Sequence, residues 1–201
     1  VHEDTVLTML AEEYTRESNA EDPVVVTTPN ASARIDERVR EAGGRVERVA
    51  LGYLHDGIAA ARAEGGEVVF AAEPWKHVHT QFGGWIDGVC SAAILAGLYA
   101  ESSLAARRDP IAERPYRKVS VPCPDDRKAA AMAELAETLP AAFPEATVDD
   151  EYGVRLELPD ASWLLVRPSG TEPYLRLYAE SDSVDELVSA AREILETAID
   201  G

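Results

Sequence analysis

The pattern of hydrophobic and polar residues changes about halfway along the chain. In the first half, short apolar runs alternate with segments in which apolar residues recur every three or four positions, which predicts buried strands alternating with amphipathic helices. Strand–helix units of this length imply right-handed crossovers, so we expect an α/β domain with a largely parallel sheet. The expected strands are 23–27, 45–49 and 67–71, and the expected helices are 3–17, 32–42, 53–63 and 85–104.

Two of these helices carry further expectations. Asp4 is available to cap the first one. The helix at 85–104 is apolar enough to be packed on most sides, and Asp87 with Gly88 is expected to turn the chain into it rather than to bind a ligand.

The second half has a different rhythm, because most of its apolar runs follow one another through short connections. This predicts an α+β domain, with an antiparallel sheet covered on one face by two helices. Ser183 and Glu186 have the spacing of a capping box at the start of the last helix. The expected strands are 118–123, 145–149, 152–158, 162–167 and 174–179, and the expected helices are 125–139 and the segment after Ser183.

The two halves are separated by a segment that suits neither helix nor strand. Residues 105–116 contain two prolines and five charged residues. We therefore expect an α/β domain at 1–106, a linker at 107–116 and an α+β domain at 117–201.

The charge balance narrows the range of partners. The chain has 37 acidic and 19 basic residues, for a net charge of -18, and its only lysines are Lys76, Lys118 and Lys128. Nucleic acids and anionic membranes both require a basic surface, so the composition disfavours both. Acidic residues on every predicted helix indicate a solvated surface that repels itself at low salt. A halophilic, haloarchaeal source would explain this charge, and an acidic mesophilic protein is the alternative.

The chain shows no leader and no long apolar stretch, so we expect a soluble, cytoplasmic protein. Cys90 and Cys123 are far apart and have no partner spacing. Buried free thiols are the expected state, with a disulfide as the alternative.

The segment VRPSGTEPYLRLYAE places cations and hydroxyls around a turn. Arg167 ends an apolar run, and Pro168 stops strand pairing because it lacks an N–H. Gly170 can adopt positive φ, so neighbouring N–H groups could converge on an anion, and the planar fork of Arg167 can bind two phosphate oxygens. The pattern fits a phosphate monoester site. The alternative is a hairpin whose Ser and Thr only satisfy turn geometry.

The run RPSGTEPYLRLY resembles the phosphate-binding loop in the last domain of the α-D-phosphohexomutases, which include phosphoglucomutase, phosphomannomutase and phosphoglucosamine mutase. In that family the loop holds the phosphate that is not being transferred. The resemblance gives this role to Arg167, Ser169, Gly170 and Thr171, with Arg176 on the next strand as a further cation.

The segment 65–101 resembles the sugar-binding segment of the family's third domain, where a strand ends in Gly-Glu-x-Ser-Gly-His and leads to Asp-Gly and a long helix. Glu73 and His77 fall on the Glu and His of that pattern, which implies that they bind the sugar. Trp75 stands where the family has Ser, and Lys76 where it has Gly. The Trp75 indole could stack on a sugar face or narrow the pocket. His77 and His79 are expected in a partly exposed loop and make a poor metal site.

The resemblance covers nearly all of this chain but only half of the family's architecture. The family's first domain carries the serine that transfers phosphate, and its second carries the aspartate-rich loop that binds Mg2+. Neither motif occurs here, so we expect no catalytic residue, no metal ligand and no activity in this chain alone.

We interpret the chain as domains three and four of an enzyme that interconverts a hexose 1-phosphate and a hexose 6-phosphate through a hexose bisphosphate. Its partners are then the phosphorylated hexose and the missing N-terminal domains. A non-catalytic sugar-phosphate-binding or regulatory protein is the alternative.

Overall fold

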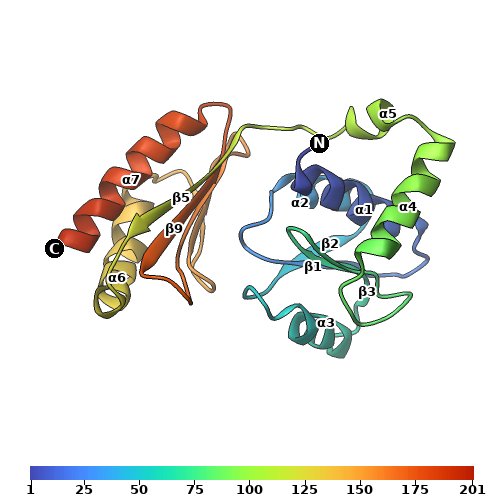
Figure 1. The fold of residues 1–201 in the computed structure, drawn as a ribbon, viewed down its shortest axis with the longest axis horizontal. Helices are drawn as coiled ribbons and strands as arrows, with labels where there is room; N and C mark the ends of the chain where they lie inside the picture. Colours follow the sequence, from blue (N-terminus) through green and yellow to red (C-terminus); the bar gives the residue numbers. More distant parts are fainter. The chain divides into compact units, whose positions relative to one another are not determined.

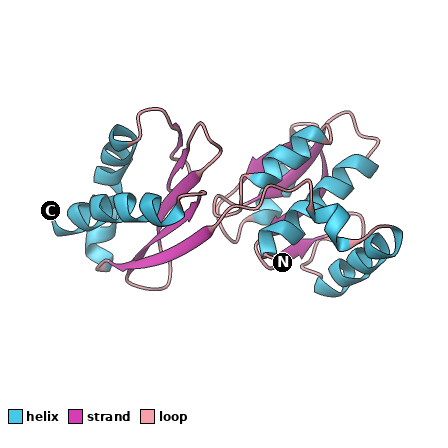
Figure 2. Ribbon diagram, turned by 90° about the horizontal axis from the view of Figure 1, so that it is seen from above, coloured by secondary structure: helices cyan, strands magenta, loops and turns pink.

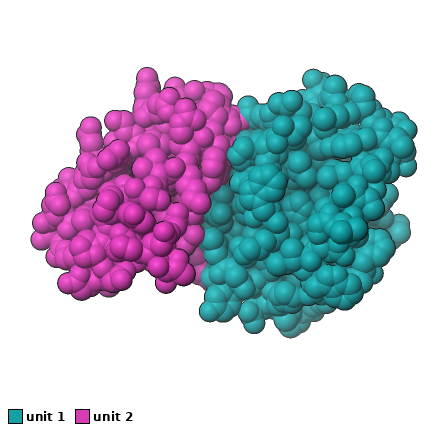
Figure 3. All heavy atoms as spheres, viewed as in Figure 1, with its two compact units in different colours: residues 1–113 teal, residues 114–201 magenta.

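The computed structural model describes residues 1–201 and divides into two compact units, Val1–Glu113 and Arg114–Gly201. Figure 3 colours these units separately, and each contains its own sheet. The segment expected as a linker is partly structured. Helix α5 (Leu104–Arg108) runs into it because Ser103 caps this helix, its side chain accepting a hydrogen bond from the Ala106 N–H at 3.2 Å.

The first unit contains a four-stranded, mostly parallel sheet. Its strands are β1 (Pro23–Thr27), β2 (Arg45–Arg48), β3 (Glu67–Glu73) and β4 (Lys76–Val78). The strand order is β2-β1-β3-β4, with β1 parallel to β2 and β3, and β4 antiparallel to β3. Every residue of β1 is buried, as is usual for a central parallel strand covered on both faces. The predicted α/β domain with a largely parallel sheet is confirmed.

Helices cover both faces of this sheet (Figure 1). Helices α1 (Glu3–Glu17) and α2 (Arg34–Glu41) pack on one face, and α3 (Leu54–Ala63) packs on the other. Gly43 and Gly65 follow α2 and α3 with φ of 94° and 96°, so the helices end where a left-handed residue is needed. The cap of α1 is His2 rather than Asp4, because Asp4 lies inside the first turn. The Asp4 backbone N–H donates a hydrogen bond to His2 Nδ1 at 3.3 Å.

Helix α4 (Gly88–Glu101) differs from the prediction of a helix packed on most sides. Only Ser91 and Leu98 are buried, and Val89 is 82% exposed. Many of its apolar residues are alanine and glycine, which have little side chain to bury. The buried and half-buried residues of α4 all lie on one side of the helix. Asp87 does cap this helix, its Oδ1 accepting the Cys90 N–H at 2.8 Å. None of the helices is both long and apolar enough to cross a membrane.

The second unit contains a five-stranded antiparallel sheet covered on one face by two helices (Figures 1 and 2). The strand order is β5-β9-β8-β7-β6. The strands are β5 (Tyr116–Pro122), β6 (Thr147–Asp149), β7 (Val154–Glu157), β8 (Trp163–Pro168) and β9 (Tyr174–Glu180), and the helices are α6 (Asp125–Ala142) and α7 (Val184–Asp200). This confirms the predicted α+β domain.

Two local predictions are corrected here. Ser183 occupies the predicted N-cap position of α7, but its side chain makes no capping bond, because its φ of -107° and ψ of 47° differ from the extended conformation in which a cap side chain reaches the first turn. Its N–H instead donates to Ser181 Oγ at 3.1 Å. Both cysteines are free thiols, and only Cys123 is buried, since α4 leaves Cys90 partly exposed.

Candidate phosphate and sugar sites

The two arginines predicted to bind phosphate lie on one face of the second sheet. β8 and β9 pair with Arg167 directly opposite Arg176. On the other side of β9, Ser120 lies opposite Arg176, and Lys118 lies opposite Tyr178. Directly paired residues project from the same face of a sheet. This face therefore carries four cations, since Arg155 of β7 lies opposite Leu165 and projects from the same side, while α6 and α7 cover the opposite, apolar face.

Arg167 is positioned by its neighbours but retains an unused donor. Its Nη2 donates to the Tyr178 hydroxyl at 3.0 Å, and its Nη1 donates to the Pro168 carbonyl at 3.1 Å. The guanidinium also lies 5.5 Å from the centroid of the Tyr178 ring. Its Nε is buried without a hydrogen-bond partner. Leaving such a donor unsatisfied costs about 1–3 kcal/mol, so this side chain is suited to a further acceptor.

Arg176 is already paired with an acid. Its Nη2 forms an ion pair with the Glu172 carboxylate, and its Nη1 donates to the Ser120 hydroxyl at 3.3 Å. The Glu172 side chain is 50% exposed, and such solvated ion pairs contribute little. An incoming anion would compete with Glu172 for Arg176.

The loop between the two arginines differs from the expected nest. Gly170 does not have positive φ, so the left-handed conformation that glycine permits here is not adopted. The hairpin closes instead through the Ser169 N–H, which donates to the Tyr174 carbonyl at 2.9 Å. This bond also occupies one amide that had been expected to face an anion. The amides left for an anion are those of Gly170 and Thr171, which are both exposed, whereas Ser169 is buried.

Lys128 holds this loop through hydrogen bonds, although it lies outside the sequence motif. From α6, its Nζ donates to the carbonyls of Ser169 and Glu172 at 2.7 and 2.6 Å, and it lies 2.6 Å from the Asp125 carboxylate. An ammonium group has three donors, so all of them are used. Lys128 therefore ties both sides of the loop to the helix beneath it.

The scarcity of lysine was a signal that could have identified this residue. Each of the three lysines contacts a residue of a candidate site or its partner. Besides Lys128 at the loop, Lys76 pairs with Glu73 at 3.1 Å, and Lys118 lies 5.7 Å from the centroid of the Tyr178 ring. The other basic residues of the chain are arginines.

Glu73 ends β3 and is held at both oxygens. One accepts the Gly52 N–H at 2.8 Å, and the other pairs with Lys76. Glu73 lies opposite Lys76, and Ala72 lies opposite His77 in the β3–β4 hairpin. Because successive residues of a strand project to opposite faces, Glu73 and His77 lie on opposite faces of the hairpin. The structure thus places these two predicted sugar ligands at one hairpin but not on one face.

Trp75 lies at the tip of this hairpin in a strained conformation. Its φ is 67°, in the left-handed region that costs a residue other than glycine about 1–2 kcal/mol. Pro74 followed by a residue of positive φ is the order found in a type II turn, where the second of these positions usually holds Gly or Asn. The indole is 78% exposed. An exposed aromatic ring held by a strained turn is typical of a binding site.

His77 is partly exposed, as predicted, but it lies in β4 rather than in a loop, whereas His79, which follows β4, is less exposed than predicted because it packs beside α1 and the start of α4. His79 is 1% exposed and His77 is partly buried. Burial lowers the pKa of His77 to about 4 and also lowers the pKa of His79. Both rings are therefore neutral near pH 7.

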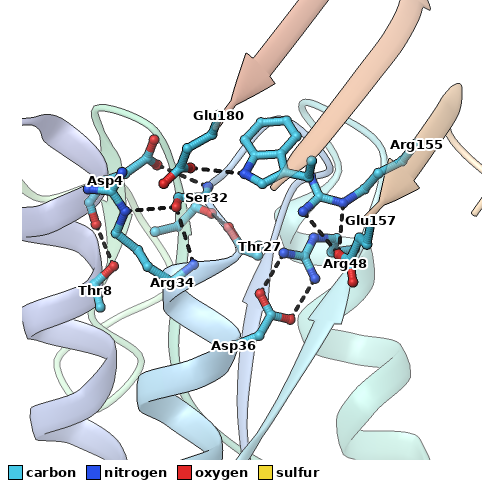
Figure 4. Close-up of polar contacts among 12 residues, drawn as sticks. Asp4, Thr8, Thr27, Ser32, Arg34, Asp36, Arg48, Arg155, Glu157 and Glu180 are labelled. Atoms are coloured by element: carbon cyan, nitrogen blue, oxygen red, sulfur yellow. Dashed lines mark hydrogen bonds and ion pairs between the residues drawn. The ribbon is translucent and has the colours of Figure 1, made fainter. Parts of the chain in front are cut away.

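The carboxyl ends of β1 and β2 carry a group of polar side chains that bond one another (Figure 4). Arg48 makes two bonds to the Asp36 carboxylate, both of 2.7 Å, and Arg34 Nε donates to Ser32 Oγ at 2.8 Å. Thr27 Oγ1 donates to the Ala72 carbonyl at 2.8 Å. The Arg48–Asp36 pair ties the end of β2 to α2, and Thr27 ties the end of β1 to β3 at the residue before Glu73, at the edge where parallel sheets commonly bind ligands.

No group of three or more His, Cys, Asp and Glu side chains is arranged to hold a metal ion. The Mg2+ that the family resemblance implies therefore has no fitting ligand set among these residues.

Each unit matches a domain of one family. Residues 2–113 match the alpha/beta/alpha domain III of phosphoglucomutase/phosphomannomutase, and residues 119–197 match the phosphoglucomutase/phosphomannomutase C-terminal domain. The chain belongs to the phosphoglucomutase/phosphomannomutase family.

Its relatives include archaeal sugar-phosphate mutases. The chain is 39% identical to a phosphopentomutase of Thermococcus kodakarensis, over 95% of this chain and 42% of the relative. It is 38% identical to a probable phosphoglucosamine mutase of Methanopyrus kandleri, over 88% of this chain and 37% of the relative. The chain thus spans about two fifths of the length of these relatives.

Solved structures agree on the fold. A phosphoglucomutase/phosphomannomutase family protein from Burkholderia thailandensis superposes with a TM-score of 0.76 at 21% identity, over 98% of this chain and 41% of that one. An N-acetylphosphoglucosamine mutase of Aspergillus fumigatus, in complex with GlcNAc-6P and magnesium, has a TM-score of 0.63 at 14% identity, over 97% of this chain and 46% of that one.

Proposed function

We propose that this chain is the sugar-phosphate-binding part of a mutase that interconverts a hexose 1-phosphate and a hexose 6-phosphate through a bisphosphate intermediate. The observation that carries the proposal is the facing pair Arg167 and Arg176 beside a hydroxyl-bearing loop, in a chain with a net charge of -18. Two guanidinium groups and the exposed amides of the loop suit the phosphate that is not being transferred. Ser169 and Thr171 supply hydroxyl donors to the same loop.

In this proposal the β3–β4 hairpin contacts the sugar. Glu73 would exchange the Gly52 N–H and the Lys76 ammonium for adjacent ring hydroxyls, which a carboxylate accepts well. Trp75 would stack on an apolar sugar face, and His77 would accept a hydrogen bond from another hydroxyl. The bisphosphate must turn over between two phosphate transfers, so a site that binds either phosphate in the same way suits this chemistry.

The 201-residue chain should not catalyse this reaction by itself. It contains no serine in a phosphoserine-like setting and no aspartate-rich loop, and the Mg2+ of the proposed enzyme would be held by domains outside these residues. We place the sugar-binding domain at 1–106 and the phosphate-binding domain at 117–201, in a cytoplasmic enzyme of a halophile.

A pentose phosphate is a second candidate substrate. The relative with 39% identity is a phosphopentomutase, whereas the relatives named as phosphoglucosamine mutases are 38% identical or less. Trp75, in place of a small residue of the family pattern, would narrow the space beside the sugar and favour a smaller ring.

Calorimetric titration of the chain with glucose 1-phosphate, glucosamine 1-phosphate and ribose 1-phosphate tests both substrates. Binding that inorganic phosphate reproduces only weakly would support a sugar-phosphate site, and the strongest ligand would select hexose or pentose. A coupled mutase assay with bisphosphate and Mg2+ should show no turnover. Turnover that persists after contaminating mutase has been removed would contradict the assignment of chemistry to other domains.

A further inference from the structure

Four polar side chains form a continuous hydrogen-bonded chain within the first unit. The Tyr14 hydroxyl lies 2.7 Å from His79 Nδ1, and His79 Nε2 lies 2.8 Å from Ser91 Oγ. Ser91 Oγ in turn lies 3.0 Å from His77 Nδ1. Tyr14, His79 and Ser91 are buried, with 5%, 1% and 6% exposure, and only His77 reaches the surface.

The surroundings of these four side chains are largely aromatic. Tyr14 stacks on the buried Phe70 with ring centroids 5.3 Å apart, and the rings of His77 and His79 lie 5.7 and 5.5 Å from Phe70. In such a place each polar hydrogen needs a partner. Burial raises the pKa of Tyr14 and lowers the pKa of both histidines, so the phenol keeps its proton and the imidazoles are neutral. Asp87 is the charged group that acts on His79.

The positions of the protons follow from counting donors at Ser91. Its hydroxyl has one proton and two lone pairs. It contacts the two imidazole nitrogens and also the Asp87 carbonyl, at 3.0 Å, which can only accept. All three contacts are hydrogen bonds only if Ser91 donates to Asp87 and both rings donate to Ser91. Any other assignment leaves at least one of the three contacts with two acceptor atoms facing each other and no proton between them.

This assignment determines both tautomers. His79 carries its proton on Nε2, so its Nδ1 accepts the proton of the Tyr14 hydroxyl. His77 carries its proton on Nδ1, which leaves a lone pair on Nε2. That nitrogen makes no hydrogen bond within the structure, and His77 is partly exposed.

We propose that Ser91, whose hydroxyl proton is committed to the Asp87 carbonyl, fixes His77 as the Nδ1–H tautomer, so that its Nε2 acts only as a hydrogen-bond acceptor for a sugar hydroxyl. Ser91 is the positioning residue for His77, and Tyr14 fixes the tautomer of His79 at the other end of the buried chain. A fully ionised phosphate ester offers acceptors and no donor, so His77 discriminates against this group and selects the sugar end of the ligand. The choice of ligand rests on the proposed function, whereas the tautomer does not.

The tautomers can be read directly, because the chain has only four histidines. Long-range 1H–15N correlation spectra of the uniformly labelled chain near pH 7 distinguish protonated from unprotonated ring nitrogens. His77 should show a protonated Nδ1 and an unprotonated Nε2, and His79 should show the reverse. A His77 protonated at Nε2 would overturn the proposal without the need for any variant.

Variants test how the tautomer is fixed. Ser91→Ala should remove the acceptor of the His77 Nδ1–H, so that both His77 nitrogens give the averaged signals of exchanging tautomers. Tyr14→Phe should shift the unprotonated Nδ1 of His79 and leave the His77 tautomer in place. Ser102→Ala, at the other end of α4, is the matched control and should change neither. An unchanged His77 spectrum in folded Ser91→Ala would overturn the role of Ser91.

Ligand titrations separate this inference from the proposed function. Glucose 1-phosphate should shift the His77 Nε2 signal, and the same concentration of sulfate, a dianion that carries no O–H, should not. An equal shift with sulfate would overturn the selection of a hydroxyl. If neither ligand shifts His77 or the amides of 169–171, the proposed function fails, while the tautomer measurement still decides whether the buried chain acts as described.

Discussion

Arg167 and Arg176 face each other across β8 and β9, although both carry a positive charge. Like charges directly opposite in an antiparallel pair are destabilising, by up to about 1 kcal/mol. Tyr178 and Glu172 offset part of this repulsion, since each binds one of the two guanidinium groups. A hairpin needed only for chain reversal would not require this pairing. An anion between the two side chains would relieve the repulsion and satisfy the buried Arg167 Nε.

Arg167→Ala should weaken binding of a hexose phosphate by about 1.5–3 kcal/mol, the contribution of a hydrogen bond to a charged group. This corresponds to a loss of about ten- to more than a hundredfold in Kd. Arg167→Lys should show an intermediate loss, because it keeps the charge but not the planar fork. Calorimetric titration measures both, with Arg192→Ala on the exposed face of α7 as the control. An Arg167→Ala protein with unchanged affinity would make the loop a simple turn.

Lys128→Met should loosen the phosphate loop without unfolding the sheet. The carbonyls of Ser169 and Glu172 lose their donor, and both belong to the loop rather than to the ladder of the sheet. We expect faster hydrogen exchange at the Ser169 amide, whose bond to the Tyr174 carbonyl closes the hairpin, and a loss of phosphate-ester affinity of about 1 kcal/mol or more.

Arg192→Met is the matched control, because it removes a cation of the same unit that pairs with Glu196 and not with the loop. It should leave the exchange rates and the affinity unchanged. A loop that exchanges at the same rate in folded Lys128→Met would show that the lysine does not hold it.

The sequence predicted the strands and helices of both units well, because their hydrophobic periods are regular and Gly43 and Gly65 mark helix ends. It failed where the outcome depends on tertiary contacts. Whether Gly170 turns left-handed depends on how the hairpin closes, and whether α4 is buried depends on what packs against it. Neither is encoded in local periodicity.

The candidate site, like the fold, was predictable where it depends on neighbouring residues and not where it depends on tertiary contacts. The motif residues were found because they lie close together in the sequence. Lys128 lies 41 residues before Ser169, and Tyr14 lies 65 residues before His79, so their contacts appear only in the folded chain. The sequence also did not predict that Glu73 and His77 lie on opposite faces of the hairpin. Their faces depend on the two-residue turn between β3 and β4, which sets how the two strands pair.

Trp75→Gly should stabilise the first unit, because glycine adopts the φ of 67° without the cost of about 1–2 kcal/mol. The gain is reduced by the larger entropy of the unfolded glycine variant, so we expect a net increase of below about 1 kcal/mol in the free energy of unfolding. Sugar-phosphate affinity should fall, since the exposed indole is lost. Urea melts and titrations measure the two effects.

Trp75→Ala is the matched control, because it removes the indole but keeps the strained backbone. It should lose affinity without gaining stability. Equal stability of the Gly and Ala variants would show that the turn is not strained at this residue.

Stability should fall as the pH falls from about 6.5 to about 4, because of His77. Its folded pKa of about 4 is below the unfolded value of 6.5, so within this window the unfolded state binds more protons. At 1.36 kcal/mol per pH unit, His77 accounts for a loss of about 3 kcal/mol, and the loss from this group stops below the folded pKa. The lowered pKa of His79 acts in the same direction.

Urea melts across this pH range test the effect. His77→Gln keeps an amide N–H that can donate to Ser91 but cannot titrate, so its stability should depend less on pH. Glu113, whose pKa Arg108 lowers to about 2, contributes in a lower window, from about 4.5 downward. A His77→Gln variant with the wild-type slope above pH 4.5 would assign the pH dependence to other groups.

Thermal stability should rise with KCl concentration. With a net charge of -18, unscreened repulsion among exposed acids destabilises the compact state. Salt shortens the range of this repulsion from about 10 Å at 0.1 M to about 3 Å at 1 M. Surface ion pairs are weakened too, but each contributes little, so the net effect should be stabilising.

Replacing three exposed acids of α6 and α7, Glu134, Glu137 and Glu193, by glutamine should raise the melting temperature at low salt and flatten its rise with KCl. Sucrose, which stabilises without screening charge, separates the two effects. A melting temperature that stays constant or falls between low and high KCl would show that charge repulsion does not limit the stability of this chain.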